Sequence, residues 1–81
     1  MILKVVEEAM VYYDPCGFIN IGAFLDEYHM EAELISDYIV HFGVIHLKEY
    51  IIETFKQTLE ERLDEDLAAA IVKRIKTSLN S

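Results

Sequence analysis

Apolar residues recur at spacings of three and four along most of the chain, with charged residues between them. This spacing gathers apolar side chains on one side of an α-helix. It predicts four helices, near residues 2–13, 28–42, 46–62 and 65–78, with an ordered loop over 14–27 packed across them. Short connections between the later helices favour antiparallel neighbours. The predicted fold is therefore all-α, a compact bundle of four helices in a single domain over residues 1–81.

The residues at the expected helix ends support these boundaries. Asp14-Pro15 ends the first helix, because proline restricts the residue before it and cannot continue a helix. Gly43 follows the last apolar residue of the second helix, and glycine is a common helix stop. Asp64 is the expected N-cap of the last helix, since its side chain can accept from free backbone N–H groups.

The predicted core takes two apolar residues from the stripe of each helix. Truncating any of them would leave a cavity in a small interior. These core residues are Val6, Met10, Leu34, Tyr38, Ile51, Phe55, Ile71 and Ile75.

Charge disfavours several classes of partner. Fifteen acidic residues against seven basic ones give a net charge of -8, which repels phosphate backbones and anionic lipid. The most apolar stretch, 35–52, contains charged residues and histidines and is not a membrane span. A single cysteine, Cys16, excludes an intrachain disulfide and fits a reducing compartment. We expect a cytoplasmic protein that binds neither nucleic acid nor membrane.

Three short motifs resemble a known family. Tyr13-Asp14-Pro15-Cys16-Gly17-Phe18 is followed by Asp26-Glu27-Tyr28 with Glu31, and then by Leu47-Lys48-Glu49-Tyr50-Ile51 with Phe55. Their order and spacing resemble the small bacterial YugE-like helical family over roughly residues 5 to 65. The resemblance implies a helical fold, and the family has no established activity to carry over.

The residues that could carry chemistry lack supporting motifs. Cys16 has no flanking nucleophile signature, and a lone cysteine is usually a small buried apolar group. His41 and His46 are five residues apart, outside the helical spacing that aims two imidazoles at one metal. His29 and Glu33 have that spacing but lack a third ligand. We expect no enzyme activity, no metal and no cofactor.

Acidic residues cluster near the start of the second helix and between the last two helices. The simplest interpretation is a solvated surface with favourable charges at helix starts. The functional alternative is recognition of a basic protein, as in an immunity- or antitoxin-type inhibitor, because tyrosines among acids are typical of interface anchors. The candidate partner-binding residues are Asp26, Glu27, Tyr28, Glu31 and Tyr38.

A second hypothesis is a structural or regulatory homodimer without an enzyme target. Several apolar residues remain after each helix has contributed its core stripe, and exposed apolar patches commonly mark twofold interfaces. The loop could instead fold back between the helices and leave a monomer. The candidate dimer-interface residues are Phe18, Ile21, Phe24, Leu25, Ile45 and Ile52.

Overall fold

The computed structural model describes residues 1–17 and 28–80, and no β-strand occurs in these two ranges. They form four α-helices: α1 (Ile2–Tyr13), α2 (His29–Phe42), α3 (Leu47–Leu59) and α4 (Glu65–Leu79). The predicted all-α bundle is confirmed. Most of the predicted 14–27 loop lies outside the described residues.

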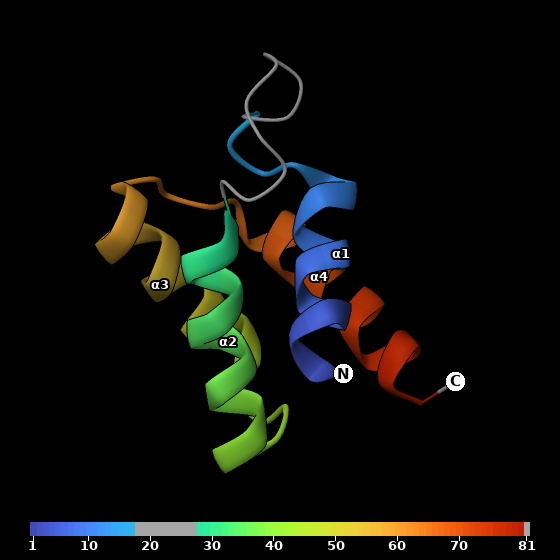
Figure 1. Cartoon of the computed structure of the whole chain (residues 1–81). Coiled ribbons are helices and arrows are strands. Elements are labelled where there is room, and N and C mark those ends of the chain that lie inside the picture. Colours follow the sequence, from blue (N-terminus) through green and yellow to red (C-terminus); the bar gives the residue numbers. More distant parts are fainter. Residues whose placement is uncertain (18–27, 81) are drawn as a thin grey trace.

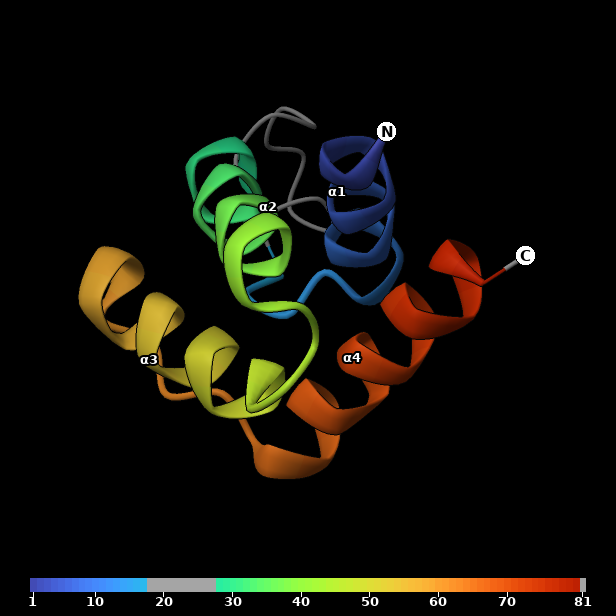
Figure 2. The ribbon, with the colours of Figure 1, turned by 90° about the horizontal axis from the view of Figure 1, so that it is seen from below.

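Each helix packs against two of the others, so the bundle is a closed ring (Figures 1 and 2). α1 contacts α2 and α4, and α3 also contacts α2 and α4. The start of α1, the end of α4 and the connection between α2 and α3 lie toward the lower end of the molecule in Figure 1. None of the helices in the described part is long and apolar enough to cross a membrane.

Three helices, α1, α2 and α3, are each followed by a residue with a positive φ. Asp14 has φ 45° and donates its N–H to Met10 O at 2.8 Å, and Gly43 has φ 74°. α3 ends at Leu59, so its predicted end at 62 is wrong. Glu60 adopts φ 55° as the left-handed C-cap of α3, and Leu63 beyond it lies in the core at 5 % exposure.

α4 begins with the predicted cap. The Asp64 carboxylate accepts hydrogen bonds from Asp66 N at 3.0 Å and Leu67 N at 3.3 Å. These two N–H groups have no partner inside the helix, so the cap satisfies them.

Six of the eight predicted core residues are fully buried, and two are not. Leu34 is 37 % exposed, so placing it in the core was wrong, and Tyr38 is half-buried and packs against the core from its edge. α2 instead turns Ala32, Ile35 and Ile39 inward, together with Glu31. The confirmed core residues are Val6, Met10, Ile51, Phe55, Ile71 and Ile75.

Candidate protein-interaction surface

Tyr28 is a buried structural residue at the start of α2 and not an exposed anchor. It is 1 % exposed, and its ring centroid lies 6.2 Å from that of Phe55. Its hydroxyl donates to Asp14 Oδ1 at 2.6 Å and accepts from the N–H of Cys16 at 3.0 Å. Burial and the bond to Asp14 raise the pKa of Tyr28 above its ordinary value of 10.0. This residue therefore ties the end of α1 to the start of α2.

Glu31 is also in the interior. Its side chain is 2 % exposed, and its Oε1 atom has no hydrogen-bond partner among the described residues. The predicted partner-binding role of Tyr28 and Glu31 is therefore corrected, because a partner cannot reach buried side chains. Asp26 and Glu27 lie outside the described residues.

Cys16 is poorly suited to nucleophilic chemistry. Burial, followed by the negative charges of Glu61, Glu31 and Asp14, raises the pKa of its thiol from 9.0 to about 11. The thiolate is the reactive form of cysteine, so the raised pKa leaves less of this form at neutral pH. Within the described ranges, no group of three His, Cys, Asp or Glu residues could hold a metal ion.

Tyr38 lies at the border between the core and the surface. Its ring stacks on Tyr50 of α3 with centroids 4.3 Å apart and planes at 21°, and Phe42 lies 5.2 Å away. Its hydroxyl donates to the carbonyl oxygen of Ile45 in the α2–α3 connection. The aromatic cluster of Tyr38, Phe42 and Tyr50 thus joins α2 to α3.

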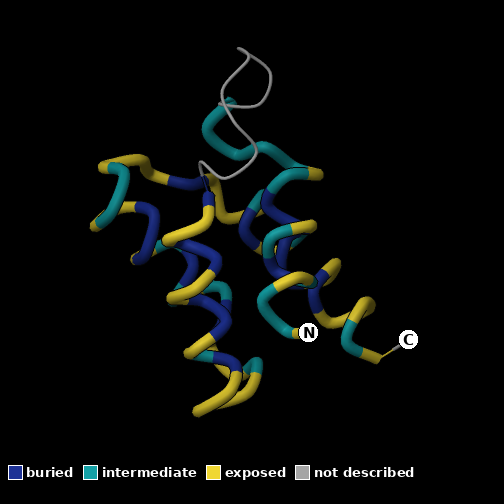
Figure 3. Tube along the Cα trace, in the orientation of Figure 1, coloured by how far each residue is buried: buried dark blue, intermediate teal, exposed yellow. Residues whose placement is uncertain are grey.

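Exposed apolar side chains concentrate on α2 and the connection that follows it. Seven large apolar residues of the described part are exposed, and only Met1 and Tyr12 lie elsewhere. The other five form what we call the α2 apolar surface: Met30 at 63 %, Leu34 at 37 %, Val40 at 62 %, Phe42 at 67 % and Ile45 at 67 %. In Figure 3 the end of α2 and the connection are exposed. The sequence already indicates an exposed apolar surface here, because α2 carries more apolar residues than one helix face can bury.

The predicted dimer-interface residues are distributed differently. Ile45 belongs to the α2 apolar surface, whereas Ile52 is half-buried and packs against the core. Phe18, Ile21, Phe24 and Leu25 lie outside the described residues. Of the two described residues of the predicted patch, the structure therefore brings Ile45 to the surface and packs Ile52 against the core.

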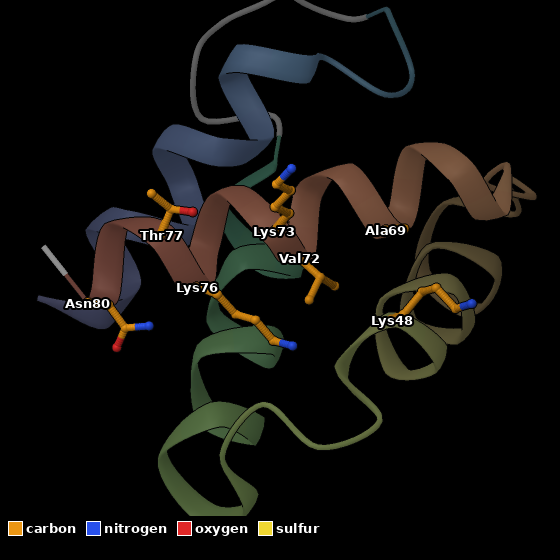
Figure 4. A pocket seen from close by; sticks show the side chains of 7 residues that line it. All are labelled: Lys48, Ala69, Val72, Lys73, Lys76, Thr77 and Asn80. Atoms are coloured by element: carbon orange, nitrogen blue, oxygen red, sulfur yellow. The ribbon is translucent and has the colours of Figure 1, made fainter.

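A basic groove lies between the start of α3 and α4. It has a volume of about 390 Å³. Lys48 and Lys76 extend to the same side of α4, and Lys73 points to the other side (Figure 4). Lys48 Nζ lies 3.4 Å from Glu65 Oε1, which offsets part of the positive charge. The groove is lined by Lys48, Ala69, Val72, Lys73, Lys76, Thr77 and Asn80.

Comparison with known proteins found no matching family model, no matching curated protein and no matching solved structure. The YugE-like resemblance therefore stays a prediction.

Proposed function

We propose that this protein is an acidic protein-interaction module that binds a basic protein through the α2 apolar surface. The observation that carries the proposal is the concentration of exposed apolar side chains on one helix and the connection after it. Contiguous exposed apolar area on a small protein commonly marks an interaction site. The described part offers no cluster for metal chemistry, and its cysteine is protonated at neutral pH.

Charge supports a basic partner. Exposed acids Glu33 and Asp37 lie on the same helix as the apolar surface, and the chain carries a net charge of -8. Complementary charge speeds encounter and disfavours wrong partners, while apolar anchors supply most of the affinity. An immunity- or antitoxin-type inhibitor that covers the phosphate-binding cleft of a nuclease is the most concrete form of this function.

The test is affinity capture from the host cell with matched variants. The double variant Met30→Ser, Phe42→Ser removes two exposed apolar side chains and should keep the helical circular dichroism of the parent. We expect it to lose the basic protein that the parent retains. Tyr12→Ser is the control, because Tyr12 is 63 % exposed but lies on α1. Equal capture by both variants would contradict the proposal.

The alternative is the homodimer, and the exposure of Ile45 at 67 % favours it. Light scattering at about 100 μM detects a dimer of micromolar affinity. A dimer mass that Ile45→Lys converts to a monomer mass would support the alternative. Ile52→Lys is a poorer choice, because Ile52 packs against the core and its replacement would also destabilise the fold.

A further inference from the structure

One row of apolar residues runs along the whole of α2. Met30, Leu34, Tyr38 and Phe42 recur at every fourth position, and residues at this spacing form a continuous ridge on a helix. Met30 and Phe42 are more than 60 % exposed, Leu34 is 37 % exposed, and Tyr38 is half-buried. The row is about 18 Å long at the α-helical rise. We call these four residues the α2 row.

The middle of the α2 row is held rigidly. Tyr38 stacks on Tyr50 and is also fixed by its hydrogen bond to the backbone of Ile45. A rigid aromatic surface loses little conformational entropy when a partner covers it. The exposed ends of the α2 row therefore offer anchoring points to a partner. Its partly covered middle offers a preformed apolar centre.

Acidic residues flank this row on both helices. Glu33 and Asp37 each lie three positions after a member of the row, which makes them its neighbours on the helix surface. On α3, Glu49 precedes Tyr50 directly and Glu53 follows it by three positions. All four carboxylates are exposed. Glu33 lies 3.3 Å from His29 Nε2, Glu49 lies within 4.0 Å of both Lys48 and His46, and Glu53 accepts from Gln57 at 3.1 Å. These contacts are at the surface, so the lysines or arginines of a partner can compete for the carboxylates.

We infer that the segment of the partner that binds here is a basic amphipathic helix, lying along the α2 row with its apolar side on Leu34 and Tyr38 and its lysines or arginines toward the flanking acids. This inference rests on the proposed function and specifies the partner's chemistry. Helices of this kind dock into apolar surfaces through side chains at i, i+3, i+4 and i+7. The 18 Å row accommodates about three turns of such a helix.

A second copy of this chain does not fit the same site. The chain has a basic helix of its own, α4, but its apolar side chains Ala68, Ile71 and Ile75 are fully buried in the core. Packing α2 on α2 would bring Glu33 and Asp37 of both copies together, and each copy carries a charge of -8. Like charges at this distance oppose association.

The test uses the full chain and a fluorescent synthetic peptide of about 18 residues, made only of Leu and Lys, with Leu at helical spacing. Two matched peptides keep the length: one has the same residues in scrambled order, and the other has Glu in place of Lys. We expect fluorescence anisotropy to show binding of the first peptide only. Nuclear magnetic resonance shifts on adding it should centre on Leu34, Tyr38 and Tyr50.

Variants of the chain test whether the peptide binds along the α2 row. Met30→Ser with Phe42→Ser should weaken binding by about tenfold or more, the size expected for losing two apolar anchors. Tyr12→Ser is the control, because Tyr12 is 63 % exposed but lies on α1, outside the α2 apolar surface. Its affinity should stay within about twofold, as for a residue outside the central contact.

Charge variants test the flanking acids separately. Glu33→Gln with Asp37→Asn should weaken binding by about threefold and reduce its dependence on salt, as for exposed ion pairs. The control pair is Glu8→Gln with Glu60→Gln, which makes the same change in net charge at exposed positions outside this surface. It should weaken peptide binding less. Equal effects of the two pairs would overturn a specific role for Glu33 and Asp37.

The remaining outcomes are equally decisive. Equal binding of the scrambled peptide, or equal loss of affinity with Tyr12→Ser, would overturn the helix along the α2 row. If the captured cellular protein depends on Met30 and Phe42 but the amphipathic peptide does not bind, the proposed function stands and this inference fails. If light scattering shows a dimer mass and Phe42→Ser converts it to a monomer mass, the occupant of the α2 row is a second copy of this chain. That result would also overturn the inference of a basic partner helix.

Discussion

The hydroxyl group of Tyr28 bridges two backbone segments, since it donates to Asp14 Oδ1 at 2.6 Å and accepts from Cys16 N at 3.0 Å. Asp14 is the residue that ends α1 in a left-handed conformation, and Tyr28 immediately precedes α2. One side chain therefore fixes the distance between two helix ends that are 14 residues apart in sequence.

Replacing Tyr28 with Phe tests this bridge, because it keeps the buried ring and removes the hydroxyl. We expect a loss of about 1 to 3 kcal/mol in the free energy of unfolding, since buried polar groups lose a partner. Urea denaturation followed by circular dichroism measures it. Tyr50→Phe is the control, and its half-buried ring should make the change nearly neutral. A similar loss in both variants would show that the bridge has no special role.

Alkaline pH should destabilise the fold through Cys16. The pKa of the thiol is 9.0 in the unfolded chain and about 11 in the folded chain, so the unfolded state releases this proton first. The stabilising contribution is therefore complete below about pH 9 and is lost as pH rises toward 11. The raised pKa of Tyr28 acts in the same direction at higher pH.

The variant Cys16→Ala isolates this contribution. Its urea midpoint should fall less than that of the parent between about pH 8 and pH 11, because alanine has no proton to release. Other groups titrate in both proteins and cancel in the comparison. Parallel curves for the two proteins would contradict the raised pKa of Cys16.

Two phenylalanines should respond in opposite ways to truncation. Phe55 is fully buried, so Phe55→Ala should cost about 3 to 5 kcal/mol and unfold much of a chain this small. Phe42 is 67 % exposed, so Phe42→Ala should change stability by about 0.5 kcal/mol or less. Thermal denaturation of the two variants checks the contrast. Marked destabilisation by Phe42→Ala would mean that its aromatic contacts contribute more to the fold than its exposure indicates.

Asp64→Ala should remove the N-cap of α4 and cost about 1 kcal/mol. Asp66→Ala changes the same charge in the first turn but leaves the cap bonds from Asp66 N and Leu67 N in place. It should therefore cost only a few tenths of a kcal/mol, the effect of a charge near a helix start. Equilibrium denaturation at neutral pH distinguishes them, and a larger loss for Asp66→Ala would refute the cap assignment.

Local patterns predicted the helices well, because helical periodicity and capping depend on residues a few positions apart. Asp64 and Gly43 each act within one turn of the chain, and both predictions are confirmed. The predicted end of α3 at 62 was wrong because Glu60 leaves the helical conformation with a positive φ, which the sequence pattern did not indicate.

The candidate site was harder to predict, because α2 carries two apolar rows side by side. The row of Leu34 and Tyr38 looked like the core, but the neighbouring row of Ile35 and Ile39 is the buried one. The buried row includes Glu31, whose charge made that side look exposed. Likewise, the burial of Tyr28 depends on Asp14, which is distant in sequence. Only tertiary packing decides which row faces inward.

The contact between α1 and α4 has a consequence for synthesis of the chain. Arg74 of α4 lies 3.7 Å from the ring centroid of Tyr12, and the two helices pack together although they are first and last in order. A nascent chain emerges with α1 first, so Val6 and Met10 lack part of their covering until α4 has left the ribosome. Apolar surface exposed during synthesis is prone to aggregation. The ring of helices therefore cannot close before α4 is available, and the apolar side of α1 is open to other contacts until then.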